Sequence, residues 1–370
     1  MSKFPWRVDG HASKQERIVS LDQFRGYTVA GMFFVNFIGG FKVAAPAPLL
    51  HHNTYCSYAD TIMPHFLFAV GFALRLVLLR EVSRHGRAVA IRRGLKRGIF
   101  LVLFGIVFYR LDGNYRTWEE LKNLGIQGFF TDSFARQPLQ ALTHIGLTTL
   151  WIVPVITLRL RWVVLFAVAS GLLHLWLSYE FWYECVFHDK FGLRGIDGGL
   201  LGFLTWTVCA AAGAAACDWR GRGALECLRP MCLWALILML AGYGISCIGV
   251  GGPMAAPPFF AHSGDVDMWT MSQRAGSLSY LVFAAGLSIA VMALFVVLCD
   301  LGSFRWGVFD DLGKNAFGAY VLHLIVLSAW EGFGPRDAPL WYALLFTISG
   351  CLLSWMMTRW CNARGLIFRL

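Results

Sequence analysis

Charged residues are scarce in this sequence. Asp, Glu, Lys and Arg make up 15% of the 370 residues, whereas 57% are hydrophobic. An ordinary soluble domain carries about 25% charge, and a disordered chain is less apolar, so both classes are excluded. The mean hydropathy of +0.57 instead indicates a chain whose solvent is lipid. Backbone groups in lipid must bond within their own segment, so we predict an all-α fold, a polytopic helix bundle in a membrane.

The sequence also lacks the patterns of a metal site, a disulfide scaffold or a secreted protein. Its ten cysteines are scattered without a CxxC motif or a His/Cys spacing that suggests zinc, so we predict no metal. Residues 1–24 mix both charge signs around no apolar core, which excludes a cleaved signal peptide. No internal repeat or linker divides the chain. We expect a cytoplasmic segment over residues 1–24 and a single membrane domain over residues 25–370.

Apolar runs that could cross the bilayer recur along the whole chain. A crossing helix needs about 20 residues, and we predict about ten of them. The third run is short and is expected to extend back through Arg93 to Lys96. The predicted runs are Gly26–Ala44, Tyr58–Leu79, Gly98–Tyr109, Leu139–Leu158, Trp162–Leu177, Gly199–Cys217, Met231–Val250, Ser277–Cys299, Asn315–Trp330 and Leu340–Arg359.

The net charge of +10 implies no nucleic-acid partner, because cytoplasmic loops of membrane proteins are rich in Lys and Arg. The distribution of these residues over the loops indicates how the chain is oriented in the membrane. Alternate loops collect most of the cations, above all the run from Arg80 to Arg97. Acids collect on the other side, at Glu119, Glu120, Asp132, Glu180, Glu184, Asp189, Asp197, Asp265 and Asp267. We therefore predict that both termini are cytoplasmic.

Two predicted outside segments are longer than a connection requires, Leu111–Pro138 and Gly251–Arg274. One interpretation is an interfacial helix followed by a disordered loop. The other is a lid over an outward-facing pocket. The sequence leaves both open.

Polar side chains in or beside the apolar runs are the candidates for function, because lipid makes them costly. His51 and His52 lie in an outside loop, and Asp60 follows at the mouth of the second run. A carboxylate placed there can orient a histidine that acts as a general base. An exposed histidine pair beside a carboxylate favoured by the helix dipole is the alternative. Further polar candidates are Asn36, His65, Arg75, His144, His174, Asn315 and His323.

Cations mark the opposite face. Arg25 begins the first run, and Lys314 precedes Asn315 at the start of the ninth. Topology alone explains cations at these positions. They are also suited to binding an anionic cytoplasmic ligand that carries phosphates.

Two stretches near the N-terminus carry a family resemblance. They are Arg17–Gly40, RIVSLDQFRGYTVAGMFFVNFIGG, and His51–Leu74, HHNTYCSYADTIMPHFLFAVGFAL. They resemble the opening of the heparan-alpha-glucosaminide N-acetyltransferase family and its bacterial relatives, SLDxFRGxxxxxMxxVN, a loop with a histidine, then ADxxFPxFLFxxG. Weaker similarities are LTHIGL at Leu142–Leu147, GIDGGLLGFL at Gly195–Leu204 and GKNAFGAYVLH at Gly313–His323.

The resemblance implies transfer of an acetyl group from cytoplasmic acetyl-CoA to an amino sugar or a sugar hydroxyl across the membrane. The implied catalytic histidine is His51 or His52, as base or acyl carrier, with Asp60 beside it. This loop lacks the Trp and Gly of the family, and His144 stands where the family has Arg. The substrate contacts we expect are Asn36, His144, Asp197 and His323, and the CoA phosphates are expected at Arg25, Lys314 and Asn315.

Two other functions stay open. One is a secondary transporter of sugars or sugar derivatives, although the chain shows no inverted repeat. The other is a haem or quinone protein with axial ligands among His65, His144, His174 and His323. For the acyltransferase we expect acyl-CoA and a sugar or glycan as partners, membrane lipid around the bundle, and a bacterial inner membrane as the location. A homodimer is an open alternative.

Overall fold

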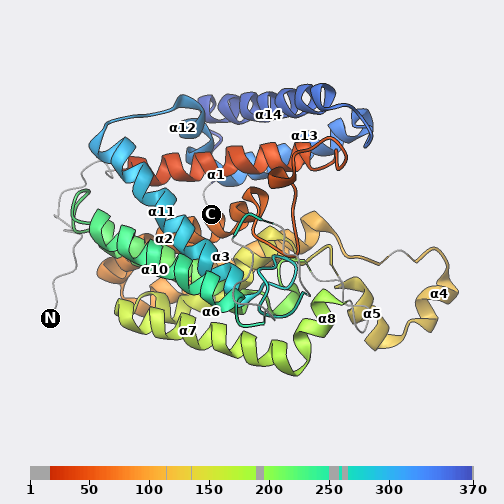
Figure 1. Cartoon of the computed structure of the whole chain (residues 1–370), viewed down its shortest axis with the longest axis horizontal. Helices are drawn as coiled ribbons and strands as arrows, with labels where there is room; N and C mark the ends of the chain where they lie inside the picture. The colour runs from red at the N-terminus through yellow and green to blue at the C-terminus, as the bar shows by residue number, and fades with distance from the viewer. Residues whose placement is uncertain are drawn as a thin grey trace.

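The computed structural model describes residues 17–113, 115–134, 136–188, 196–249, 258–260 and 266–368. Within these ranges every regular element is a helix (Figure 1). Most of the predicted cytoplasmic segment and the acids Asp189 and Asp265 lie outside the described residues. The α-helices are α1 (Val19–Ile38), α2 (Tyr58–His85), α3 (Arg87–Tyr109), α4 (Trp118–Asn123), α5 (Gly125–Ser133), α6 (Ala141–Ile156), α7 (Leu160–Leu177), α8 (Tyr183–Phe187), α9 (Phe203–Arg220), α10 (Leu228–Ser246), α11 (Leu278–Phe295), α12 (Gly307–Lys314), α13 (Ala316–Trp330) and α14 (Leu340–Ala363).

Short helical segments of other types join or extend these helices. Two π-helical stretches, η2 (Ser178–Trp182) and η5 (Val296–Leu301), continue α7 into α8 and prolong α11. The 3₁₀ turns among the described residues, η1 (Ala47–Leu49), η4 (Gly199–Leu201) and η6 (Glu331–Phe333), lie in or beside loops.

Seven helical stretches among the described residues are long and apolar enough to cross a membrane. They are Tyr58–His85, Leu160–Phe187, Gly199–Arg220, Leu228–Ser246, Leu278–Leu301, Ala316–Phe333 and Leu340–Ala363. The predicted helical membrane bundle is therefore confirmed. The count of ten is not reached on length and composition, because α1, α3 and α6 are not among the seven, and α6 has only 16 residues.

The first helix does not follow its predicted bounds. It runs from Val19 to Ile38, whereas the apolar run predicted Gly26–Ala44. Its first turn is held by Asp300, whose carboxylate accepts hydrogen bonds from the backbone N–H of Ser20 at 3.1 Å and from its hydroxyl at 2.6 Å. The sequence gives no sign of this distant cap. The third helix begins at Arg87 and so confirms the expected extension through Arg93.

The predicted outside segment Leu111–Pro138 forms α4 and α5, which project from the bundle at the end where α1 leads into its loop (Figure 1). Ser133 is the one buried residue described in these two helices. Exposed apolar side chains, including Trp118 and Ile126, cover them. This favours the interfacial helix over the lid. Half of the other long segment, residues 251–257 and 261–265, lies outside the described residues.

Helices α2 and α9 form the centre of the bundle and touch backbone to backbone. Their spanning stretches are 67% and 78% buried, the highest values among the seven. A Cβ atom on Gly71 would lie 1.9 Å from the carbonyl oxygen of Ala210, and one on Gly213 would lie 2.0 Å from that of Phe68. Small residues on both helices allow this approach, as is common where lipid gives no hydrophobic drive between helices.

Arg75, one of the costly polar residues of the sequence, locks the same helices together. Its side chain is 2% exposed and donates from Nε and Nη2 to both carboxylate oxygens of Asp218 on α9, each at 2.6 Å. Its Nη1 also donates to the carbonyl of Leu158 at 2.9 Å and to that of Ile156. Arg75 therefore has a structural role, which joins α2 and α9 to the end of α6.

Gly71→Ala tests the close contact. The added methyl group would meet backbone that has no room to move, and overpacking of this kind costs about 1–3 kcal/mol. Gly244→Ala is the matched control, because nothing lies within 4 Å of a Cβ at that position of α10. We expect a lower melting temperature in detergent for Gly71→Ala and little change for Gly244→Ala. Equal melting of the two variants would contradict the packing.

Candidate functional site

Helix α2 begins with the carboxylate that the sequence singles out. Ser57 is the N-cap, and its hydroxyl accepts a hydrogen bond from the backbone N–H of Asp60 at 3.2 Å. In return, Asp60 Oδ2 accepts from the backbone N–H of Ser57 at 3.0 Å. This capping box fixes the carboxylate beside the loop between α1 and α2. Tyr280 of α11 holds the same turn by donating to the carbonyl of Asp60.

The Asp60 side chain is buried and surrounded by donors. Its Oδ1 lies 2.9 Å from Nδ1 of His51, and its Oδ2 accepts from the backbone N–H of His52 at 3.3 Å. The Ser57 hydroxyl lies 2.9 Å from Oδ2 and 2.8 Å from the carbonyl of Leu50, so its single proton serves one of the two at a time. A buried carboxylate needs such donors, because an unpaired charge is costly there.

Asp60 sets the tautomer of His51. An ionised carboxylate only accepts, so Nδ1 of His51 carries the proton and Nε2 keeps a lone pair. The His51 side chain is 53% exposed and that of Asp60 is 1% exposed, so the histidine is the accessible member of the pair. Burial lowers the pKa of His51, but the hydrogen bond and charge of Asp60 and the charge of Asp197 outweigh it, and the pKa is raised.

His52 has a different environment. Its Nε2 lies 2.8 Å from the carbonyl of Ala47, which can only accept, so this nitrogen carries the proton and is occupied. Its ring stacks on Tyr55 with the centroids 4.2 Å apart. The geometry thus distinguishes two histidines that the sequence could not: Asp60 orients His51, whereas His52 braces the loop.

Asp197 lies close to this pair and is held by a residue that the sequence did not indicate, Gln273. Nε2 of Gln273 donates to Asp197 Oδ1 at 2.7 Å, and the indole N–H of Trp206 donates to the Asp197 carbonyl at 2.7 Å. Burial raises the pKa of Asp197 to about 6, against the hydrogen bond of Gln273 and the charge of His51, which lower it. Gln273 sits in a loop without a motif, so no sequence signal could have singled it out.

Asn36 and His323 form a second polar pair, between α1 and α13. Asn36 Nδ2 lies 2.9 Å from His323 Nε2, and His323 Nδ1 lies 2.5 Å from the carbonyl of Tyr320. The carbonyl requires a proton on Nδ1, so Nε2 accepts from the Asn36 amide. The Tyr320 hydroxyl is hydrogen-bonded to that of Tyr109 on α3. Asp197 interacts electrostatically with both tyrosines. The Asn36–His323 pair therefore lies near the His51–Asp60 pair.

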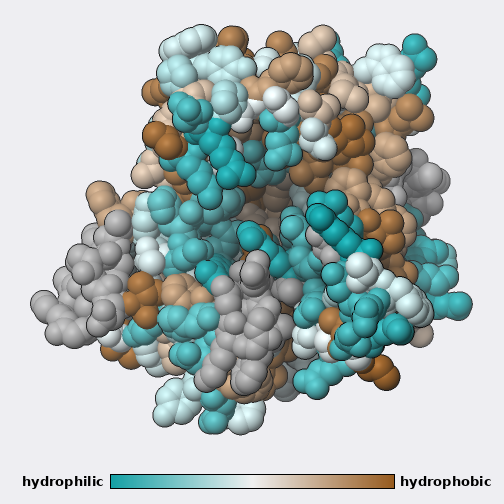
Figure 2. All heavy atoms as spheres, turned by 90° about the vertical axis from the view of Figure 1, so that its right-hand side faces the viewer, coloured by the Kyte–Doolittle hydropathy of each residue, from teal (hydrophilic) through white to brown (hydrophobic). Residues whose placement is uncertain are grey.

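His144 lies at the turn that carries Asp197. A Cβ atom on Gly202 would be 2.2 Å from the Asp197 carbonyl and 3.1 Å from His144 Cε1. The imidazole is fully buried, and neither ring nitrogen has a hydrogen-bond partner among the described residues. The structure therefore brings together His51, Asp60, Asp197 and His144, with Asn36 and His323 nearby. This is the end of the bundle that faces the viewer in Figure 2, where the surface is hollowed and hydrophilic residues surround the hollow.

The three residues predicted to bind phosphates lie toward the opposite end of α1. The carboxylate of Asp22 is 3.9 Å from Arg25, and Lys314 is paired with Asp310. Asn315 donates to the carbonyl of Leu366 at 3.0 Å and accepts from the N–H of Phe368 at 3.1 Å. Its amide therefore holds the C-terminal segment, which leaves Arg25 and Lys314, each with an aspartate beside it, as the candidate phosphate ligands.

Arg97 of α3 adds a cation that the sequence treated only as part of a basic run. It interacts electrostatically with Arg25, and like charges placed together raise each other's energy. Its Nε is buried without a hydrogen-bond partner in the part of the chain that the structure describes. Two neighbouring guanidinium groups, one of them unsatisfied, form a candidate site for an anion.

The remaining buried histidines have local partners. His65 Nδ1 lies 2.8 Å from the Ser288 hydroxyl, and His174 Nδ1 lies 3.3 Å from that of Ser178. Within the described ranges, no group of three His, Cys, Asp or Glu side chains is arranged to hold a metal ion.

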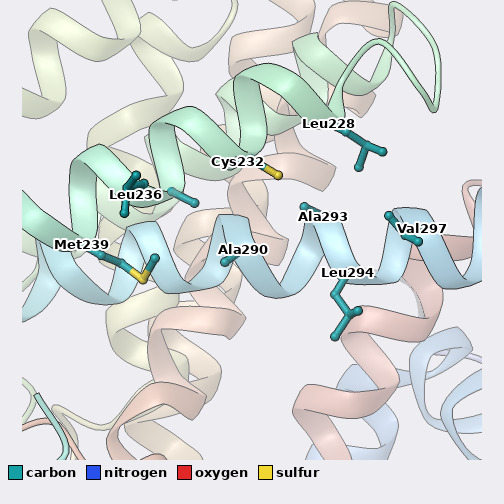
Figure 3. A pocket seen from close by; sticks show the side chains of 9 residues that line it. Leu228, Cys232, Leu236, Met239, Ala290, Ala293, Leu294 and Val297 are labelled. Carbon is teal, nitrogen blue, oxygen red and sulfur yellow. The ribbon is translucent and has the colours of Figure 1, made fainter.

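A groove of about 380 Å³ between α10 and α11 lies apart from all these groups (Figure 3). It is lined by Leu228, Cys232, Ala235, Leu236, Met239, Ala290, Ala293, Leu294 and Val297. These side chains offer no charge and no oxygen or nitrogen, so we assign the groove no part in the polar site.

No model of a known protein family matches the chain, and no curated protein matches it. The family resemblance of the N-terminal motifs therefore stays a prediction, and function must be inferred from the chemistry of the residues.

Asp60→Asn tests whether the carboxylate organises the site. The amide can accept from the N–H groups of His52 and Ser57 only if its NH₂ faces Nδ1 of His51, which forces His51 into its other tautomer. In the opposite orientation buried donors face donors, at about 1–3 kcal/mol each, and in both orientations the charge-assisted hydrogen bonds are lost. We expect a clear fall in melting temperature in detergent. Asp132→Asn, at an exposed position of α5, is the matched control and should melt like the wild type. An unchanged melting temperature for Asp60→Asn would show that Asp60 is not the organising residue.

Proposed function

We propose that this chain is a membrane-embedded acyltransferase that moves an acetyl group from cytoplasmic acetyl-CoA to an amino sugar or sugar hydroxyl on the other side. The observation that carries the proposal is the His51–Asp60 pair, a half-exposed imidazole oriented by a fully buried carboxylate. The same arrangement of groups activates nucleophiles in hydrolases. The resemblance of the surrounding motifs to acetyltransferases supports the choice of reaction.

In this mechanism Nε2 of His51 removes the proton from the acceptor hydroxyl or amine as the freed electron pair attacks the thioester carbonyl. The C–S bond then breaks, the CoA thiolate leaves, and the proton on Nε2 passes to the sulfur. Asp60 stabilises the imidazolium formed in between. Direct transfer and a transient acyl-histidine both agree with this arrangement.

The developing oxyanion requires a donor. His323 has no N–H to spare, because Nδ1 donates to Tyr320 and Nε2 accepts from Asn36. The Asn36 amide has a second N–H, so Asn36 is the member of the pair that we assign to the thioester carbonyl or the acceptor. Asp197 and His144, at the neighbouring turn, are assigned to the acceptor.

The CoA phosphates are assigned to Arg25 and Lys314, and Arg97 supports this assignment because its Nε lacks a partner among the described residues. Guanidinium groups bind phosphate oxygens through charge-assisted hydrogen bonds. The ten crossings, the cytoplasmic termini and the bacterial inner membrane belong to the same proposal. The basic run at the junction of α2 and α3, far from the histidine loop, supports the orientation.

His51→Ala should lower acetyl transfer by about 10² to 10⁴, the usual contribution of a general base. His52→Ala should retain much more turnover, because the His52 ring only braces the loop. His85→Ala is the control, and its turnover should equal that of the wild type, because this side chain is exposed at the other end of α2. Because a base acts when neutral, wild-type turnover should rise with pH through a pKa above the ordinary histidine value of about 6.5.

The assay uses proteoliposomes loaded with labelled acetyl-CoA and supplied with external amino sugars. Turnover of His51→Ala within tenfold of wild type would reject His51 as the base. A second set of vesicles contains no CoA and receives labelled sugar outside. Accumulation of this sugar inside the vesicles would support the secondary transporter instead.

Sidedness can be tested with Asn53→Cys in the histidine loop and Arg87→Cys at the start of α3, both at exposed positions. Cys56 is buried, so the background needs replacement of the exposed Cys232 and the half-buried Cys247 and Cys351. We expect an impermeant maleimide to label position 53 in intact cells and position 87 only after lysis. Labelling of position 87 from outside would contradict transfer across the membrane.

A further inference from the structure

Gln273 acts on His51 but takes no part in the proposed acyl transfer. Its side-chain oxygen Oε1 is buried and makes no hydrogen bond in the described part of the chain. The side chain nevertheless interacts with the imidazole, since it is one of the groups that raise the pKa of His51. An unsatisfied acceptor beside the candidate base requires an explanation, because buried polar atoms are nearly always paired.

The orientation of the Gln273 amide is determined by its neighbour. Asp197 Oδ1 accepts only, so the group 2.7 Å away must be the NH₂ of Gln273 and not its oxygen. The oxygen is therefore the end left to face His51. Asp197 is itself fixed, since Trp206 donates to its carbonyl and Gly198 donates to the carbonyl of Arg274 at 3.0 Å.

The turn that carries Gln273 is equally constrained. The hydroxyl of Ser277 accepts from the N–H of Ser272 at 2.9 Å, and the N–H of Ser277 donates to the Ser272 carbonyl at 3.1 Å. A Cβ atom on Gly276 would lie 2.9 Å from the Cα of Gly198, so the two loops touch through glycines. Asp197 and Gln273 are thus held as one rigid unit next to the imidazole.

We propose that Gln273 is a positioning residue for His51, whose Oε1 accepts the Nε2–H of the imidazolium while Asp60 holds Nδ1–H. The inference rests on the proposed role of His51 as the base. In the neutral histidine Nε2 has no proton to donate, which agrees with the missing hydrogen bond at Oε1. Once Nε2 has taken the proton of the sugar hydroxyl or amine, it can donate that proton to Oε1 of Gln273, which is then hydrogen-bonded. The site therefore stabilises the imidazolium of His51, which the proton transfer produces.

The proposal is tested on the proton affinity of His51, without any turnover. Diethyl pyrocarbonate modifies neutral imidazole, so the pH dependence of His51 modification, followed by peptide mass spectrometry, reports its titration. Gln273→Met keeps the volume of the side chain but removes the acceptor. We expect the midpoint for His51 to fall by about one pH unit, a tenfold loss of proton affinity.

Gln273→Asn is the second variant, for the case in which Gln273→Met does not fold. Its amide is one methylene too short to reach Asp197 and His51 together, so the same downward shift is expected. Gln127→Met, at an exposed position of α5, is the matched control and should leave the midpoint unchanged.

Asp60 and Asp197 are the charged groups that act on His51, and Asp197 titrates in the same range. The comparison is therefore repeated in an Asp197→Asn background, where the effect of Gln273→Met should persist. An unchanged or raised midpoint in the folded variants, or loss of the effect in that background, would overturn the proposal. Absence of acetyl transfer in the wild type would reject the proposed function and leave the titration result standing.

Discussion

The need to satisfy the buried carboxylate of Asp60 determines the geometry of the whole site. Three of the groups around it belong to the loop before α2: Nδ1 of His51, the N–H of His52 and Ser57. Each is fixed as a consequence of a charge that cannot be left unpaired in apolar surroundings. The loop therefore has one arrangement in which it can close over the start of α2. In that arrangement one histidine is oriented and accessible, and the other is tied to the backbone.

The sequence was sufficient for the class of fold and for part of this site. Hydropathy predicts the long apolar helices of the bundle. The sequence also predicts that Asp60 orients His51 or His52, and the distance of 2.9 Å shows that it contacts His51. Periodicity could not give the start of α1, because Asp300 caps it from the far end of the sequence. Nor could it choose between adjacent histidines, since the choice depends on which carbonyl lies next to His52.

Gln273 shows why the remainder of the site was out of reach. A glutamine in a loop has no special propensity, and its importance arises from two neighbours, His51 and Asp197, that are far away in the chain. Their proximity depends on the close contact of Gly198 with Gly276 and on the backbone contact between α2 and α9. Both are properties of backbone approach. A pattern of side-chain polarity along one chain contains no information about them.

The two polar ends of α1 constrain how one ligand could serve both. Arg25 and Asn36 are eleven residues apart on a continuous helix, which corresponds to about 16 Å along its axis. Arg97 has an unsatisfied guanidinium nitrogen near the first end, and Asn36 has an amide hydrogen to spare at the other. The first end is rich in cations, with Asp22 and Asp310 beside them, whereas the second end offers a base and carboxylates, with Arg136 acting on Asp197. A long molecule with an anionic head and a reactive tail satisfies both ends at once, whereas a compact sugar satisfies only the second. The separation of charges along α1 therefore supports the proposed acyl-CoA, extended along the bundle, over the alternative of a transported sugar alone.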